Sequence, residues 1–74
     1  MKRYFYYIAL IKENDGKEHV VHGTAGLEHK SARFKYAAIS MHLMEEYKVP
    51  FSEVAISSLE EIDKEDYETI QTLK

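Results

Sequence analysis

The chain has 74 residues, no cysteine and a formal net charge of −3, which limits it to one small domain near the lower bound for an independent hydrophobic core. Without cysteine it has neither disulfide bonds nor thiolate ligands or nucleophiles, a composition compatible with a reducing cytoplasm. No apolar run reaches the ~18 residues that a membrane-spanning helix needs, so we expect no membrane insertion.

The charges are unevenly distributed along the chain. Residues 1–37 carry seven Lys or Arg and four Asp or Glu, a net +3, whereas residues 38–74 carry three Lys and nine Asp or Glu, a net −6. This asymmetry favours a folded molecule with faces of opposite sign, which would attract a second copy or a charged partner. The alternative interpretation is an ordinary solvated surface.

The first predicted strand begins near Tyr4, ends at about Lys12, and is apolar on both faces. Because side chains alternate along a strand, one face carries Tyr4, Tyr6, Ile8 and Leu10 and the other carries Phe5, Tyr7, Ala9 and Ile11. A sheet covered on one side only should alternate apolar and polar residues. Both faces of this strand therefore require cover, either from the chain itself or from another molecule.

The segment that follows predicts a three-residue hairpin loop closed by Glu13 and Lys17. Asn and Asp suit the centre of a type I turn, and Gly16 suits the left-handed position after it. The resulting register pairs Lys12 with Glu18, Leu10 with Val20, Ala9 with Val21 and Ile8 with His22. The second strand is expected from about Glu18 to Ala25, with the segment 23–26 ending it and beginning a loop.

A long helix is predicted from Ala32 to about Tyr47, with Ser31 as its N-cap and Pro50 beyond its end. It too is apolar on two sides: one carries Phe34, Ala37, Ala38, Met41 and Met44, and the opposite one carries Tyr36, Ile39, Leu43 and Tyr47. One side should pack on the sheet. The other remains for a closing helix or for a partner.

A third strand is expected over Ser52–Leu59, in which Val54 and Ile56 face one way and Ala55 and Leu59 the other. Asp63 should then cap a short closing helix, with Asp66 three residues on in a carboxylate variant of the capping box. This helix is too short to cover both the far face of the sheet and the outer side of the long helix.

These elements predict a single α+β domain over residues 1–74, in the order β-β-α-β-α. A right-handed crossover carries the third strand past the first. The expected architecture is a small three-stranded antiparallel sheet of order 2-1-3, packed against one long helix, with a short C-terminal helix added. This short, cysteine-free ββαβα organisation resembles small accessory proteins of bacteriophages and prophages in general format, without a shared motif.

The motifs predict no catalytic residues, no cofactor and no metal site. His19 and His22 lie three apart on a strand and so point to opposite faces, which is unsuitable for binding one ion. The GxxG spacing of Gly23 and Gly26 is that of the KH-domain loop, but here it leaves a strand, and a flexible turn explains both glycines. No nucleophile elbow, dinucleotide fingerprint or P-loop is present. We expect a protein that is not an enzyme.

The expected function is that of a cytoplasmic protein-interaction module, which forms a homodimer or binds one protein partner. Association would use the uncovered apolar side of the first strand or of the long helix, with tyrosines as anchors. The candidate contact residues are Tyr4, Tyr6, Tyr36, Ile39, Leu43 and Tyr47.

Two alternatives from other classes remain open. The first is a nucleic-acid-binding protein that uses N-terminal basic residues, such as Lys2 and Arg3, beside stacking tyrosines. The second is an acidic decoy that inhibits a nucleic-acid-handling protein through the acids of the C-terminal segment, including Glu61, Glu65 and Glu68. The negative net charge and the absence of an RRM consensus disfavour the first alternative.

Overall fold

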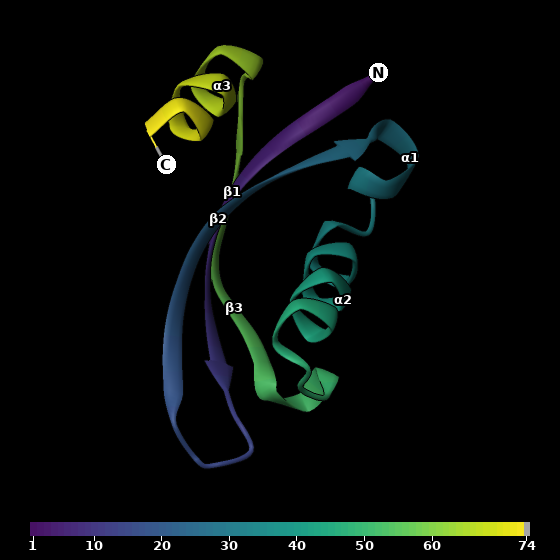
Figure 1. Ribbon diagram of the computed structural model, residues 1–74. Coiled ribbons are helices and arrows are strands. Elements are labelled where there is room, and N and C mark those ends of the chain that lie inside the picture. Colours follow the sequence, from purple (N-terminus) through teal and green to yellow (C-terminus); the bar gives the residue numbers. More distant parts are fainter. Residues whose placement is uncertain (74) are drawn as a thin grey trace.

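The computed structural model describes residues 1–73 and shows one three-stranded antiparallel sheet with helices on both sides (Figure 1); Lys74, the last residue of the predicted domain, lies outside this range. The strands are β1 (Lys2–Lys12), β2 (Glu18–Glu28) and β3 (Val54–Ile62). Their order is β2-β1-β3, which confirms the predicted sheet with β1 at its centre. The predicted pairing of β1 with β2 is also confirmed, from Lys12 opposite Glu18 to Ile8 opposite His22.

The β1–β2 connection is the predicted three-residue hairpin loop. The Glu13 N–H donates to the Lys17 carbonyl at 2.8 Å, and the Gly16 N–H donates to the Glu13 carbonyl at 2.9 Å. Gly16 has φ +86°, the left-handed conformation that glycine adopts at little cost. The Asp15 carboxylate accepts the Lys17 N–H at 2.9 Å, so local side-chain chemistry completes the turn.

The hydrophobic core lies between the sheet and helix α2 (Lys35–Tyr47). From β1 it takes Phe5, Tyr7, Ala9 and Ile11, all buried. From α2 it takes Ile39 and Leu43, which lie on one side of the helix because they are four residues apart. The α2 side with Ile39 and Leu43 is therefore the side that packs on the sheet.

Helix α3 (Lys64–Leu73) lies on the opposite side of the sheet from α2 (Figure 1). Its predicted cap is confirmed, since the Asp63 carboxylate accepts the Asp66 N–H at 2.8 Å. Its Tyr67 ring packs on the Tyr4 ring with centroids 4.5 Å apart. The chain thus covers part of the second face of β1 itself, at the end where β1 begins.

The long helix differs from its prediction at its beginning. The chain forms a short helix α1 (His29–Ala32), breaks at Arg33 and Phe34, and then forms α2. Phe34 has φ −120° and ψ 39°, outside helical geometry, and no side chain caps either helix. The prediction of Ser31 as N-cap of a helix from Ala32 is wrong, because β2 continues to Glu28 and helical turns start directly after it.

Strand β2 also runs further than predicted, through the segment expected to form a loop. Gly23 and Gly26 both lie within β2, opposite Tyr7 and Tyr4 of β1. A Cβ atom on Gly23 would overlap the Tyr7 hydroxyl, and one on Gly26 would lie 3.3 Å from the Tyr4 ring. The two glycines make room for cross-strand aromatic rings rather than for a turn.

Strand β3 contains a β-bulge that changes the predicted alternation. Ser58 lies opposite Ile8 and Ile56 lies opposite Ala9, so Ser57 is an extra residue. The Ser57 hydroxyl donates to the Ile8 carbonyl at 3.1 Å. As a result Leu59 packs against the core together with Ile56, and the prediction that it faces the other way is wrong.

The beginning of β3 also differs from its prediction. Residues Phe51–Glu53 form a short 3-10 helix, η1, so the strand starts at Val54 rather than at Ser52. At its other end the strand continues to Ile62, three residues beyond the predicted Leu59. η1 follows the end of α2 after three residues and leads the chain back into the sheet.

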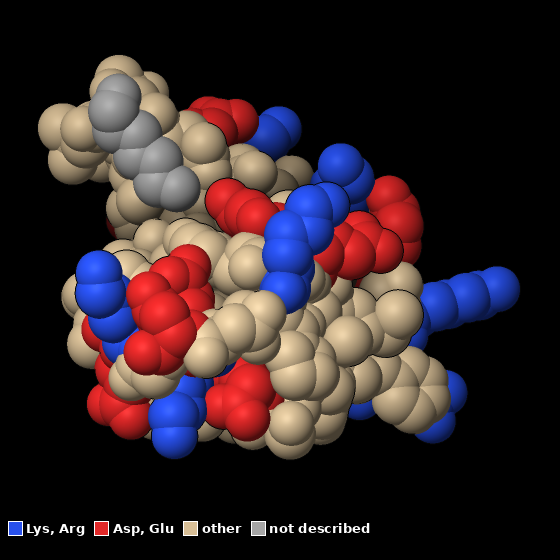
Figure 2. Space-filling model, turned by 60° about the horizontal axis from the view of Figure 1, so that its bottom comes forward, with Lys and Arg blue, Asp and Glu red and all other residues tan. Residues whose placement is uncertain are grey.

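The fold mixes the two charge blocks of the sequence. β1, from the basic half, pairs with β3, from the acidic half, and the Arg3 guanidinium binds the Glu61 carboxylate through two hydrogen bonds of 2.9 and 2.6 Å. Figure 2 shows acidic and basic groups interspersed on one side of the molecule, with uncharged surface between them. Opposite-signed faces, expected from the sequence, are therefore not formed on that side.

Candidate functional site

The two apolar sides of α2 have different environments, and this decides which candidate contact residues are accessible. Ile39 is 2% exposed and Leu43 is 0% exposed, since both pack against β1. Neither side chain can contact a partner while the domain is folded. The two are therefore core residues, and their prediction as contact residues does not fit the folded domain.

The side of α2 that points away from the sheet carries an apolar stripe. We call this the α2 stripe: Phe34, Ala37, Met41 and Met44. Ala37, Met41 and Met44 are spaced by four and three positions, so they follow one side of α2, and Phe34 lies immediately before the helix begins. Phe34 is 68% exposed and Met41 is 59% exposed, while Met44 is half-buried. Two large apolar side chains on this line are thus mostly in solvent.

Two further exposed aromatic residues lie near the ends of α2, with Tyr36 on the opposite side of the helix from the stripe. Tyr36, in the first turn, is more than half exposed, and the Lys35 ammonium lies 5.8 Å from the centre of its ring. Phe51, in η1 just beyond the C-terminal end, is also more than half exposed. Tyr47 is half-buried and packs against the core. Of the candidates on the long helix, Tyr36 is the one left open to solvent.

The candidates on β1 are occupied by other parts of the same chain. Tyr4 packs under Tyr67 of α3, and the Tyr6 hydroxyl shares a 2.9 Å hydrogen bond with Nδ1 of His22. Beside them, the Gln71 amide of α3 donates a hydrogen bond to the Thr24 hydroxyl. The tyrosines thus contact α3 and β2, which leaves little of their rings for a partner.

Beyond α3, the same face of the sheet keeps a smaller uncovered area. We call it the far-face patch, and it consists of Ile8, Leu10, Val20 and Ala55. Leu10 lies opposite Val20 on one side and Ala55 on the other. Val20 is 64% exposed, whereas Leu10 is half-buried. This patch is the second apolar surface that the fold leaves open.

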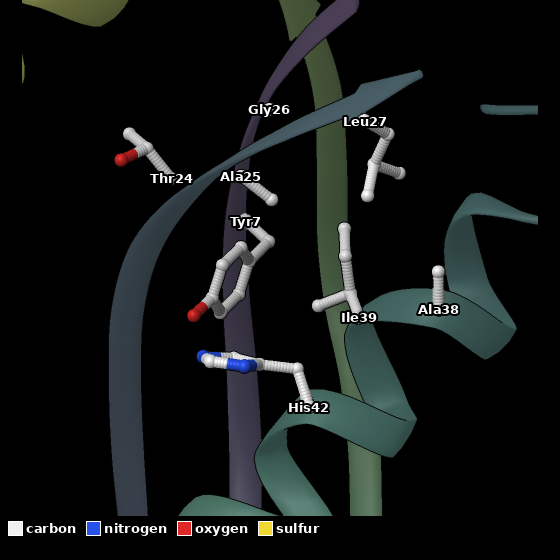
Figure 3. A pocket seen from close by; sticks show the side chains of 8 residues that line it. All are labelled: Tyr7, Thr24, Ala25, Gly26, Leu27, Ala38, Ile39 and His42. Atoms are coloured by element: carbon white, nitrogen blue, oxygen red, sulfur yellow. The ribbon is translucent and has the colours of Figure 1, made fainter. Parts of the chain in front are cut away.

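A pocket of about 250 Å³ lies between β2 and α2 (Figure 3). Its lining consists of Tyr7, Thr24, Ala25, Gly26, Leu27, Ala38, Ile39 and His42. The Tyr7 hydroxyl and the His42 ring both line it (Figure 3). Burial, assisted by the nearby negative charge of Glu46, raises the pKa of Tyr7 above its ordinary 10.0, so this phenol is neutral near pH 7. The described lining supplies a phenol and an imidazole but no carboxylate.

The histidines have separate local contacts. His19 lies 3.1 Å from Glu13, His42 lies 3.2 Å from Glu46, and His22 is bound to Tyr6. Within residues 1–73, no group of three or more His, Cys, Asp or Glu side chains gathers in a way that could hold a metal ion. The sequence argument that His19 and His22 point to opposite faces agrees with their different partners.

No protein-family model, curated protein or solved structure matches this chain. In the described part of the chain, no helix has the length and apolar character needed to cross a membrane. The geometry of the surface is therefore the basis for a functional proposal.

Proposed function

We propose that the protein is a small, non-enzymatic interaction module of the cytoplasm that associates with a second copy of itself. The observation that supports this is the gathering of exposed large apolar side chains around one helix: Phe34, Tyr36, Met41 and Phe51 are all more than half exposed and all lie on α2 or at its ends. Exposed large apolar side chains that gather in one region of a small domain are typical of protein-interaction sites.

The energetics favour covering this surface. Burying one Phe or Met side chain is worth about 1.5–3 kcal/mol. The stability of a typical domain is only about 5–15 kcal/mol, so two such side chains per copy are a substantial contribution. Aromatic residues and Met are also enriched in the buried centres of protein interfaces.

The two alternatives have less support. A nucleic-acid platform needs free tyrosine rings and free cations, but Tyr4 packs on Tyr67 and Arg3 is bound to Glu61. An acidic decoy needs unpaired acids, but Glu61 is bound to Arg3, and Glu68 lies 3.9 Å from Lys64. Self-association therefore remains the function that the geometry supports best.

Sedimentation equilibrium from about 10 to about 500 µM tests the proposal, because interfaces of modest size dissociate in this range. We expect a mass that rises with concentration toward twice the 8.7 kDa of one chain. A mass that stays at 8.7 kDa throughout would overturn it.

A further inference from the structure

Resting on that proposed function, we infer that the second copy docks on the α2 stripe, with the two α2 helices antiparallel across a two-fold axis near Ala37 and Met41. The occupant of the stripe is thus another molecule of this chain. Three features carry the inference: the symmetry of the stripe, the placement of charge along α2, and the features that disfavour pairing through the sheet edges.

The stripe is self-complementary in an antiparallel arrangement. Phe34 of one copy then meets Met44 of the other, and Ala37 meets Met41. Each contact occurs twice, as a two-fold axis requires. The small Ala37 side chain leaves room for Met41 of the other copy, so the helices can approach closely at the axis. Met side chains adapt well to such irregular contacts.

The charges of α2 are arranged against its own helix dipole. Its first turn holds no acid and its last turn no base; instead Lys35 is its first residue, and Glu45 and Glu46 lie in its last turn. Acids near the N-terminus and bases near the C-terminus would stabilise an isolated helix. In an antiparallel pair, each acidic end lies beside the basic end of the other helix. The second copy therefore supplies the charge that α2 lacks.

The same register brings a specific ion pair together. With Phe34 against Met44 of the other copy, Arg33 lies close to Glu45 of that copy. Both residues are exposed, and neither has an ion-pair partner in the described chain. A parallel arrangement would instead place the basic ends together and the acidic ends together. Lys48, just after α2, is the exception to this separation of charge.

The sheet edges disfavour the competing mode, in which strands of two copies pair. Antiparallel pairing of β2 with itself about Gly23 would place Glu18 opposite Glu28 of the other copy, which repel. β3 carries the bulge at Ser57 together with Glu60 and Glu61. Bulges and charges are features that keep edge strands from pairing between molecules.

The size of the contact predicts a reversible dimer. Thirteen residues make a helix about 20 Å long, so two such helices bury less than the roughly 800 Å² per partner of a standard interface. We therefore expect dissociation on dilution rather than a permanent dimer.

The test compares two substitutions of matched exposure by sedimentation equilibrium, with circular dichroism to confirm folding. Met41→Lys places like charges near the axis and should weaken the dimer by about a hundredfold or more. Val20→Lys, in the far-face patch, is the control and should leave the dissociation constant within about twofold. If Val20→Lys dissociates the dimer and Met41→Lys does not, the α2 inference is overturned while self-association stands. If the unmodified chain is monomeric throughout, the proposed function itself fails.

Charge exchange tests the antiparallel orientation. Arg33→Glu and Glu45→Arg should each weaken the dimer, because each creates two like-charge contacts across the axis. The double variant recreates opposite pairs and should regain most of the affinity. If the double variant loses as much dimerisation free energy as the two single variants together, the antiparallel arrangement is excluded.

Discussion

Individual side chains explain positions that appear interchangeable in the sequence. Gly23 and Gly26 are the same residue type and lie three positions apart on β2, so they face opposite sides of the sheet. Tyr7 lies over Gly23 in the core and Tyr4 lies over Gly26 under α3. Each glycine leaves room for a tyrosine side chain of β1. The two tyrosines therefore explain why β2 has glycine at these two positions.

Gly23→Ala should lower the free energy of unfolding by about 1–3 kcal/mol, because the added methyl group overlaps the Tyr7 ring and hydroxyl within a packed core. Gly26→Ala should cost less, since its Cβ would lie at 3.3 Å and the half-buried Tyr4 ring can shift. Urea denaturation measures both. In a Tyr7→Phe background part of the Gly23→Ala cost should disappear; a cost equal in both backgrounds would contradict the hydroxyl contact.

The Arg3–Glu61 pair predicts a pH dependence of stability. The hydrogen bonds from Arg3 lower the pKa of Glu61 below its ordinary 4.5. Because the folded-state pKa is the lower one, the stabilisation is fully present above about pH 4.5 and is lost as the pH falls through the folded value. The melting temperatures of the native chain and of Glu61→Gln should therefore converge as the pH falls below 4.5. A difference that stays constant with pH would mean that this pair does not contribute.

At the scale of elements, the features predicted correctly are those decided by local chemistry. The hairpin follows from Asn14, Asp15 and Gly16, and the α3 cap follows from Asp63 and Asp66. The order of strands follows instead from a right-handed crossover, a general rule of chain topology, and agrees with the apolar content of β1. The features predicted wrongly depend on contacts between distant residues, because the sequence pattern of one segment contains no information about the neighbour against which it packs.

The α2 helix illustrates this limit. Its two sides are both apolar and of similar length, so periodicity cannot decide which one meets the sheet. The pattern alone predicts Ile39 and Leu43 on the contact surface, whereas both lie in the core. The break at Phe34 likewise depends on where β2 ends, since the chain must turn from the edge of the sheet onto its face.

The β3 bulge gives a prediction at the same scale. Deleting Ser57 should leave the domain folded, because the remaining serine takes the position opposite Ile8 and Leu59 still faces the core. Deleting Ala55 should destabilise it by about 1.5–3 kcal/mol, because Val54 and Ile56 can then no longer both face inward. Thermal unfolding followed by circular dichroism compares the two deletions. Equal destabilisation by both would mean that the bulge is needed for more than register.

At the scale of the whole molecule, the chain carries apolar surface on two opposite sides, the α2 stripe and the far-face patch. A two-fold contact through the α2 stripe closes on itself, whereas a second contact through the far face would link dimers into longer assemblies. In this arrangement α3 has a role beyond stability, because it covers Tyr4 and reduces the far-face area. The uncovered area of the far side is thereby reduced to the far-face patch.

Tyr67→Ala tests this role of α3. Removing the ring that packs on Tyr4 should loosen α3 and enlarge the far-face patch, so that dimers associate further at high concentration. Sedimentation velocity should then show species larger than a dimer, while the native chain shows none. Adding Val20→Lys to Tyr67→Ala should return the chain to dimers, because it places a charge within the enlarged patch. If Tyr67→Ala remains no larger than a dimer, the exposed far face is not adhesive, and α3 serves to stabilise the fold alone.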